Sequence, residues 1–359
     1  MSQAYRYSHF GVPLRFFVGS CAWRHQGNAF SFGGASHRMT THSVFLPFMP
    51  SRPEQIVPFA AFVQRSAAGR LWQGQALALD SHQLFSYAAG MGFRVPVGFG
   101  VNLMPFSHPL EAALQARSLA AVTGHPLVAG FGPGAAGLQR SMLGSAYASP
   151  LTAAREYLSV MRALLQGEPI RQDGTYHTLH AVNLAPVHAP AVELGLGVLR
   201  PGMARLAGEV ADVAITWLTP PSYLREQLLP ALREGAEKAG RPTPRVVTLV
   251  PVALKRADRD PVEMVLHGNS AHLQLPHYVD TLRRAGVEVD ATDTAAGART
   301  LVDSGVFAYG TPSSIADVLR EYEDVGVDEL VVNMTGACKR YGPRVALEDL
   351  DALFTELAG

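Results

Sequence analysis

The stretch that decides the fold is Val192-Glu-Leu-Gly-Leu-Gly-Val-Leu-Arg-Pro-Gly-Met-Ala-Arg-Leu-Ala-Gly-Glu-Val-Ala-Asp-Val-Ala-Ile-Thr-Trp-Leu-Thr219. It opens with a short apolar run, turns through three glycines and returns as a second apolar run, Val213 to Trp217. Pro201 stands where the first helical position is expected, since the nitrogen there needs no partner inside the helix. The pattern predicts a strand, a glycine turn, a helix and a second strand.

The predicted helix begins in a way that suits an anion. Its first turn, Pro201-Gly-Met203, leaves backbone N–H groups without partners inside the helix, and Arg200 stands beside them. Such a terminus can bind a phosphate of a nucleotide-like cofactor. The alternative is an ordinary turn whose glycines serve geometry alone, and the spacing by itself favours that alternative. The strict G-x-G-x-x-G fingerprint is absent.

The same alternation of apolar runs and helical spacing extends over the chain on both sides of this stretch. Eight strands are expected, each followed by a helix: two lie within the opening stretch, and the others lie at 43–47, 71–72, 96–105, 127–132, 246–254 and 329–333. Residues 171–179 form a small excursion, and residues 256–304 form a long insertion after the seventh strand. This count predicts an α/β fold, a (β/α)8 TIM barrel; an open doubly wound sheet is the alternative.

Composition and charge exclude several classes of function. The 359 residues include 30 Lys plus Arg and 30 Asp plus Glu, so the formal net charge is zero. There is accordingly no electrostatic case for nucleic acid or an anionic membrane as partner. The two cysteines, Cys21 and Cys338, lack metal-ligand spacing, which argues against a zinc site or a disulfide scaffold. No apolar run reaches the length of a membrane-spanning helix, and we expect a cytoplasmic protein.

The first 42 residues differ from the rest, because they contain arginines but no acidic residue. The apolar run at 16–23 is too short and too poorly flanked for a signal peptide. Two interpretations stay open: a physiological start at Met39, which we favour, or a flexible or partner-binding arm. We place residues 1–42 outside the fold and expect one domain over residues 43–359.

If the chain is a barrel, function belongs at the carboxyl ends of its strands. The residues expected there include no pair of carboxylates, no histidine cluster and no nucleophile elbow, which argues against hydrolysis and metal catalysis. His108 fits a helix start, and Cys338, in an expected loop beside Lys339, has no base near it in the sequence. Catalytic residues therefore stay unassigned. A barrel end lined by glycines, backbone groups and apolar side chains suits a planar cofactor that carries out the chemistry itself.

Six segments, in order, resemble the luciferase-like superfamily of flavin- and deazaflavin-dependent oxidoreductases. They are Arg70-Leu-Trp-Gln-Gly-Gln75, residues 97–109, Gly130-Phe-Gly-Pro-Gly134, the helix end from Arg155 to Pro169, Leu206-Ala-Gly-Glu-Val-Ala-Asp212 and Tyr309-Gly-Thr-Pro312. The resemblance covers residues 43–359 and implies a (β/α)8 barrel with its cofactor at the strand ends. Within the superfamily, Leu199-Arg-Pro-Gly-Met203 and the segment after it look most like the branch that uses coenzyme F420; FMN is the alternative cofactor.

The resemblance also implies where the cofactor lies. Residues 197–203 would bind its phosphate, and Gly100-Val101 matches the place where such enzymes carry a non-proline cis peptide behind the deazaflavin ring. The cofactor-site candidates are Gln75, Gly100, Val101, Asn102, Gly130, Gly132, Gly197, Val198, Leu199, Arg200, Gly202, Met203, Thr216 and Trp217. The substrate-site candidates are Phe48, Gln73 and Tyr147.

The chain departs from the sugar-phosphate dehydrogenases of that branch. Those enzymes carry an Asp-His pair after strand two and a Glu after strand four, where this chain has Gln75-Ala76 and Pro133. Alcohol oxidation needs a base for the hydroxyl proton, so these departures argue against it. Reduction of an activated C=C or C=N bond asks less, because the reduced deazaflavin supplies a hydride and water or the Tyr147 hydroxyl supplies a proton.

The resemblance implies a small-molecule or modified-peptide substrate, such as dehydroalanine in natural-product biosynthesis, and a homodimer. The insertion at 256–304 would be a lid that shapes the pocket, and a solvated loop is the alternative. Two other functions stay open for the whole chain. One is an FMN-dependent monooxygenase served by a separate flavin reductase, and the other is a non-catalytic cofactor-binding subunit.

Overall fold

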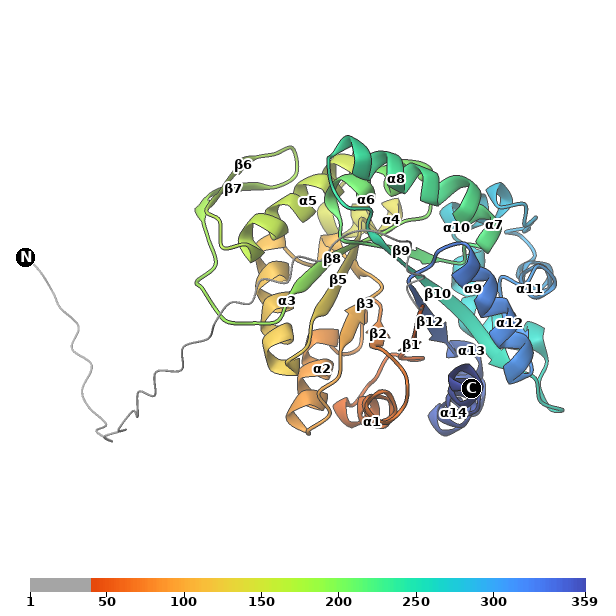
Figure 1. Cartoon of the computed structure of the whole chain (residues 1–359). Coiled ribbons are helices and arrows are strands. Elements are labelled where there is room, and N and C mark those ends of the chain that lie inside the picture. The colour runs from red at the N-terminus through yellow and green to blue at the C-terminus, as the bar shows by residue number, and fades with distance from the viewer. Residues whose placement is uncertain (1–39) are drawn as a thin grey trace, which may run out of the picture. The chain divides into compact units, whose positions relative to one another are not determined.

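Eight parallel strands close into a barrel in the computed structural model, which describes residues 40–359 (Figure 1). Around the barrel these strands are β1 (Thr41–Phe45), β2 (Leu71–Gln73), β3 (Val97–Phe99), β5 (Leu127–Gly132), β8 (Val192–Gly197), β9 (Val213–Trp217), β10 (Arg245–Leu254) and β12 (Glu329–Asn333). β1 pairs in parallel with both β2 and β12, so the sheet has no open end. The predicted (β/α)8 barrel is confirmed, and the doubly wound alternative is excluded.

Helices surround the strands and connect each strand to the next. In chain order they are α1 (Val57–Arg65), α2 (Ser81–Gly90), α3 (Pro109–Thr123), α4 (Ala136–Leu143), α5 (Pro150–Leu165), α6 (Pro201–Val210), α7 (Pro221–Tyr223), α8 (Leu229–Lys238), α9 (Pro261–Leu273), α10 (Pro276–Arg284), α11 (Thr294–Asp303), α12 (Pro312–Asp324), α13 (Thr335–Tyr341) and α14 (Pro343–Ala358). Many begin with proline, whose fixed φ suits a first helical turn. Within residues 40–359, no helix has the length and apolar character needed to cross a membrane.

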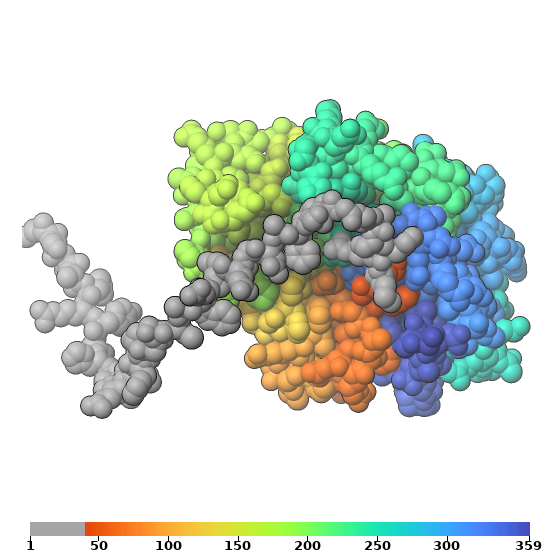
Figure 2. Space-filling model, in the orientation of Figure 1, coloured from red at the N-terminus to blue at the C-terminus, as the bar shows by residue number. Residues whose placement is uncertain are grey.

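The two ends of the described chain meet. β1 lies beside β12, and the rings of Phe62 in α1 and Phe354 in α14 pack edge to face with centroids 5.5 Å apart. In the space-filling view the orange N-terminal part and the dark blue C-terminal part of the barrel lie next to each other (Figure 2). The ring of helices is therefore closed along with the ring of strands.

Two expected strand boundaries need correction. The first strand begins at Thr41, two residues before the expected start, because the Thr41 N–H donates to Asp328 O at 3.0 Å. Thr41 and His42 therefore belong to the first strand; the expectations for residues 1–39 lie outside the described residues. The expected strand at 96–105 is interrupted, and its second part is β4 (Asn102–Leu103), which pairs with β5.

Alternating side chains divide the apolar residues of the barrel strands into an inner and an outer set. The inner set is Trp72, Val128, Val213, Ile215, Val247, Leu249 and Val331. Their neighbours along the strands, such as Ala214 and Val246, pack outward against the helices. The barrel interior is therefore filled up to the level of Ile215 and Leu249, and a ligand can lie only above it.

A buried carboxylate closes the amino-terminal end of the barrel. Glu329 is 2% exposed, and its Oε1 accepts hydrogen bonds of 2.7 Å from Ser43 Oγ and from Trp72 Nε1. Arg70 and Arg245 lie 3.4 and 3.5 Å from its two oxygens. Because two hydrogen bonds and two arginines compensate this buried charge, this end is structural and leaves the carboxyl ends of the strands for function.

The two segments that interrupt the alternation of barrel strands and helices, residues 171–179 and the insertion at 256–304, both contain regular secondary structure. The small one is an antiparallel hairpin of β6 (Ile170–Asp173) and β7 (Thr178–Val182). The long insertion carries α9, α10 and α11, whose apolar side chains form one core together with Leu218, Ala253 of β10 and Ala337 of α13, so the solvated-loop alternative is wrong. Arg259 at its start is buried and forms an ion pair with the buried Asp349 of α14, which fixes this end of the insertion to the barrel.

Candidate functional site

Bare backbone lines one side of the barrel interior. The residues are Gly130 and Gly132 of β5 and Gly195 and Gly197 of β8. A Cβ atom on Gly130 would lie 2.1 Å from the Phe99 carbonyl oxygen, and one on Gly195 would lie 2.8 Å from Ile215 Cδ1. Glycine is required at Gly130 because the atom it would meet belongs to the backbone, whereas at Gly195 the Ile215 side chain would have to move. We call these four residues the glycine wall.

The Val101 side chain lies against the upper part of the glycine wall. Cβ atoms on Gly132 and Gly197 would lie 3.0 and 3.4 Å from its two methyl carbons. The peptide bond between Gly100 and Val101 is cis, as the resemblance predicted. Val101, Phe45 and Trp217 pack on the inner apolar set of the barrel. Together with the glycine wall they form an apolar platform at the carboxyl end of the strands.

Glutamines hold the cis peptide bond from the β2 side. The Gly100 N–H donates to Gln73 O at 2.9 Å, and the Gln75 N–H donates to Val101 O at 3.0 Å. The Gln75 side chain also bonds within the protein, since its Oε1 accepts from Leu103 N at 3.1 Å. Asn102 is half-buried in β4. The structure thus places Gln75 as a brace of the platform.

Gln73 itself is 3% exposed, and neither its Oε1 nor its Nε2 has a hydrogen-bond partner among the described residues. Strand alternation places its side chain on the face of Leu71, which packs outward, and opposite to that of Trp72, which packs inward. The Gln73 side chain is therefore turned away from the platform, although the Gln73 backbone oxygen supports the platform by accepting from Gly100 N.

The α6 N-terminus has the predicted form. Val198 is buried, Leu199 O accepts from the Tyr223 hydroxyl at 3.2 Å, and Arg200 is the N-cap residue without a side-chain capping bond. Pro201 starts the helix, Gly202 is exposed and Met203 is half-buried. Free N–H groups of the first helical turn therefore lie directly after the carboxyl end of β8, where an anion would be stabilised.

The Arg200 side chain reaches across to the insertion. Its Nη2 lies 2.7 Å from Asp280 Oδ2 of α10, and Arg284 Nε contacts the same oxygen at 2.8 Å. The hydrogen bond from Arg284 lowers the pKa of Asp280, with the charges of Arg200 and Arg283 acting in the same direction. Arg200 is half-exposed, so this pair is screened by water and adds little stability. The insertion thus brings further cations beside the α6 N-terminus.

The end of β9 separates two side chains that we expected together. Trp217 faces the platform, and its Nε1 is buried without a hydrogen-bond partner among the described residues. Thr216 faces outward, where its hydroxyl lies 2.9 Å from that of Thr248 in β10. The Thr216 side chain therefore lies away from the platform, because successive strand residues point to opposite faces.

Two of the substrate-site candidates pack on the protein around the mouth. Phe48 lies edge to face on Phe59, with ring centroids 5.6 Å apart. Tyr147 lies edge to face on Tyr176 of the β6–β7 hairpin, with centroids 5.0 Å apart. Burial raises the pKa of the Tyr147 hydroxyl, so it stays protonated at neutral pH and can donate a hydrogen bond.

Two polar residues of the insertion were not among the site residues expected from the sequence. Asn269 and His272 are one turn apart on α9, and Asn269 Nδ2 and His272 Nδ1 are buried without partners among residues 40–359. The His272 ring contacts Trp217 at a centroid distance of 5.4 Å. No motif marks them, because their position depends on how α9 packs over the end of β9.

The titratable candidates from the sequence are accounted for by the packing of the described residues. Within residues 40–359, no three side chains of the metal-binding types come together. His108 is the N-cap of α3, where its Nδ1 accepts from Leu110 N at 3.2 Å. Cys338 lies in α13 and not in the expected loop, and burial raises the pKa of its thiol to about 12. A reactive thiolate is excluded, because the charge of Lys339 lowers this pKa less than burial raises it.

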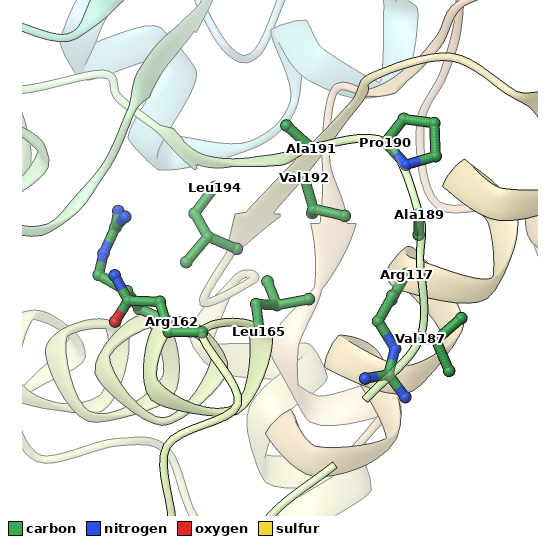
Figure 3. Close-up of a pocket in the computed structure, with 10 residues that line it drawn as sticks. Arg117, Arg162, Leu165, Val187, Ala189, Pro190, Ala191, Val192 and Leu194 are labelled. Atoms are coloured by element: carbon green, nitrogen blue, oxygen red, sulfur yellow. The ribbon is translucent and has the colours of Figure 1, made fainter. Parts of the chain in front are cut away.

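A cavity of about 290 Å³ lies at the opposite end of β8 (Figure 3). Arg117 and Arg162 line it, together with apolar residues of β8 and the segment before it. Both guanidinium groups are hydrogen-bonded within the protein, since Arg117 donates to Ala185 O at 2.8 Å and Arg162 donates to Asp212 Oδ1 at 2.9 Å. This cavity is therefore a gap between α3, α5 and β8, remote from the platform.

Comparison with known proteins adds a family and relatives. A protein-family model described as luciferase-like monooxygenase matches residues 30–329. The 5,10-methylenetetrahydromethanopterin reductase of Methanolobus tindarius is 25% identical over 307 residues, which are 80% of this chain and 92% of that protein. The F420-dependent glucose-6-phosphate dehydrogenase of Nakamurella multipartita is 35% identical over 97 residues, 27% of this chain and 29% of that one.

Solved structures share the fold at lower identity. An F420-dependent secondary alcohol dehydrogenase in complex with an F420-acetone adduct superposes with a TM-score of 0.69 at 18% identity, over 88% of this chain and 99% of that chain. The oxygenating constituent of 3,6-diketocamphane monooxygenase from Pseudomonas putida, in complex with FMN, gives 0.65 at 18% identity, over 89% and 98%. At this identity the superpositions establish the fold alone.

Proposed function

We propose, from the premise that the chain belongs to the luciferase-like monooxygenase family, that it is an F420-dependent oxidoreductase that reduces an activated double bond. The relatives with F420 or methanopterin chemistry in their names support the deazaflavin over a flavin. When bound in its reduced form, this cofactor supplies a hydride. The protein's own task would be to hold the ring, exclude water and orient the acceptor.

The observation that carries the proposal is the apolar platform. The glycine wall presents no side chains, and Val101 fills the space above Gly132 and Gly197. A flat ring of the deazaflavin type can lie against such a surface over a large area, with backbone and methyl groups behind it. The Gly100 and Val101 backbone, braced by Gln73 and Gln75, would fix the height of the ring.

The phosphate of the cofactor would lie at the α6 N-terminus. The free N–H groups of the first turn and the Arg200 guanidinium follow the carboxyl end of β8. Arg284 is close to Arg200, because both contact the same carboxylate oxygen of Asp280. A helix N-terminus and a cation together stabilise a negatively charged group. On binding, Arg200 would exchange Asp280 for the phosphate.

The substrate would be uncharged and at least partly apolar. Large hydrophobic side chains are exposed on the segments that follow the carboxyl ends of the strands: Met49, Leu77, Phe106, Met142, Leu143 and Leu151. A neutral double bond conjugated to a polar group needs no counter-charge from the protein. Small enones and the dehydroalanine residues of modified peptides, as in natural-product biosynthesis, have this character.

Reduction fits the site better than alcohol oxidation. Alcohol oxidation needs a base that accepts the hydroxyl proton. The positions expected to carry it are occupied by Gln75, Ala76 and Pro133, none of which is a base. An FMN-dependent monooxygenase is the second candidate, favoured by the structural likeness to a monooxygenase that holds FMN. A non-catalytic cofactor-binding subunit is the third, and the scarcity of titratable groups around the platform keeps it open.

Two further features stay predictions. A homodimer through α2 and α3 would cover the outer face of α3, where Leu114 and Val122 are 46% and 41% exposed. A cytoplasmic location fits an enzyme that depends on a reduced deazaflavin. Neither is needed for the chemistry proposed above.

The test is a parallel titration of the protein with F420 and with FMN by fluorescence quenching. We expect micromolar binding of F420 and much weaker binding of FMN. Arg200→Ala should weaken F420 binding by roughly 1–3 kcal/mol if the guanidinium contacts the phosphate, and Arg320→Ala, on the exposed face of α12, is the control. Preference for FMN would move the monooxygenase to first place, and binding of neither would favour the non-catalytic subunit.

A further inference from the structure

Four buried polar atoms without partners belong to the end of β9, the residues just after it, and α9. They are Trp217 Nε1, Thr219 Oγ1, Asn269 Nδ2 and His272 Nδ1, none of which has a hydrogen-bond partner among the described residues. Thr219 and Asn269 are 1% and 2% exposed. Proteins rarely leave buried polar groups unpaired, because the lost hydration is not replaced. The cluster indicates that the partners of these atoms come from outside residues 40–359.

Two aromatic rings of this cluster lie in contact. The Trp217 and His272 centroids are 5.4 Å apart with the planes tilted by 58°, and Tyr278 packs edge to face on His272 at 5.0 Å. Trp217 also packs on the inner apolar set of the barrel. The indole N–H, which can only donate, is therefore at the edge of the platform and beside an imidazole.

The imidazole is uncharged at neutral pH. Burial lowers the pKa of His272 to about 4, and the positive charges of His277 and Lys339 act in the same direction. A neutral imidazole carries one N–H donor and one acceptor nitrogen. Trp217 and His272 can thus present two N–H donors without a full positive charge. Such a pair suits an oxygen that is neutral in the bound substrate and gains negative charge during the reaction.

We propose that the Trp217 indole N–H and the His272 imidazole N–H bind the carbonyl oxygen of the substrate, and that the substrate is therefore an α,β-unsaturated ketone or amide. This inference rests on the proposed reduction by a deazaflavin and names the acceptor for it. The carbonyl oxygen has two lone pairs and can accept from both donors. A C=N bond without a conjugated carbonyl would leave one of them unused.

The reaction balances with these roles. The hydride forms a C–H bond at the β-carbon, the electron pair of the C=C bond moves toward the carbonyl, and the oxygen becomes an enolate oxygen. Trp217 and His272 stabilise that negative charge by hydrogen bonding. A proton from water then adds at the α-carbon to give the saturated carbonyl compound, and the deazaflavin is left oxidised. Neither side chain changes its protonation state.

The first experiment needs no turnover. The full-length protein is loaded with oxidised F420, cyclohex-2-enone labelled with ¹³C at the carbonyl is added, and the carbonyl stretch is measured by infrared difference spectroscopy. Bound enone should absorb at lower wavenumber than enone in water. Trp217→Phe and His272→Phe, which keep a ring and remove a donor, should each reverse part of the shift. His272→Gln retains an N–H donor and should keep most of it.

The second readout is the rate with reduced F420. Loss of either donor should lower kcat for cyclohex-2-enone by about 10²–10³-fold, as for other donors to a developing oxyanion. His267→Phe, at an exposed position on α9, is the matched control and should leave kcat unchanged. The F420 dissociation constant should stay the same in the His272 and His267 variants.

The outcomes separate this inference from the proposed function. A protein that binds F420 but neither binds the enone nor shifts its carbonyl stretch would overturn the donor pair and leave the deazaflavin assignment intact. An unaltered stretch and kcat in Trp217→Phe and His272→Phe would do the same. Failure to bind F420 at all would instead overturn the proposed function on which the inference rests.

Discussion

Leu218 has a left-handed backbone conformation, with φ of 54°, at the residue after β9. Large side chains avoid this region, and the strain is of the order of 1–3 kcal/mol. The side chain is 2% exposed and belongs to the apolar core that includes the insertion, and Trp217 before it packs on both that core and the inner apolar set of the barrel. The turn at the strained residue therefore buries the Leu218 side chain in the first core and leaves the indole between the two, at the edge of the platform.

At the same scale, His272 should make stability depend on pH. Its pKa is about 4 in the folded protein and near 6.5 when unfolded, so between these values the unfolded chain binds more protons. The free energy of unfolding should therefore fall as the pH decreases from 6.5 to 4, by at most about 3 kcal/mol from this residue. Urea unfolding at several pH values measures it.

His272→Gln is the control for this prediction, because glutamine does not titrate. His42, His177 and His277 also have pKa values lowered by burial, and they remain in both proteins. The difference between the two pH curves isolates His272. Parallel curves would show that His272 is hydrated and charged in the folded protein at acid pH, and would remove the basis for a neutral donor.

At the scale of elements, α6 and α8 pack through glycines. A Cβ on Gly235 of α8 would lie 1.9 Å from the Arg205 backbone oxygen, and one on Gly208 of α6 would lie 2.2 Å from Leu232 O. Neither contact can be relieved by rotating a side chain. Close packing therefore holds α6, and with it the anion-binding N-terminus, against α8.

Gly235→Ala should force the two helices apart and lower the free energy of unfolding by about 1–3 kcal/mol or more. F420 affinity should fall as well, since the α6 N-terminus moves with its helix. Gly137→Ala is the comparison, because a Cβ there meets nothing within 4 Å and alanine favours helix by up to about 1 kcal/mol. Equal stabilities for the two variants, measured by urea unfolding, would contradict the packing argument.

At the scale of the whole molecule, the barrel depends on where its first strand begins. Thr40 Oγ1 donates to Val327 O at 3.0 Å, Thr41 N donates to Asp328 O at 3.0 Å, and His42 Nε2 lies 3.0 Å from Glu323 Oε1. These contacts join β1 to the segment before β12. They close the ring of strands at its amino-terminal end.

A chain that starts at Met39 keeps all of these contacts and should unfold like the full-length protein. A chain that starts at Ser43, the boundary expected from the sequence, should be less stable by about 2 kcal/mol, at roughly 1 kcal/mol for each of the hydrogen bonds lost from Thr40 and Thr41. The thermal unfolding midpoints of the full-length chain and the two shortened chains test both expectations. Equal midpoints for the two shortened chains would show that the start of β1 contributes nothing to closure.

The sequence alone determined the order and type of the main elements. Apolar runs separated by helical spacing predicted eight strands, and proline and glycine marked the start of α6, because local backbone preferences decide such features. The family resemblance located the cis peptide bond at Gly100-Val101. These signals lie within segments of a few residues and need no knowledge of the rest of the chain.

Tertiary structure alone decided which side chains meet at the platform. Thr216 is next to Trp217 in the sequence, yet it faces Thr248 on the other side of the sheet. His272 is 55 residues from Trp217 in the numbering, yet their rings touch. The physical reason is that strand registry and the packing of the insertion over β9 set these distances, and both follow from contacts between segments far apart in the chain.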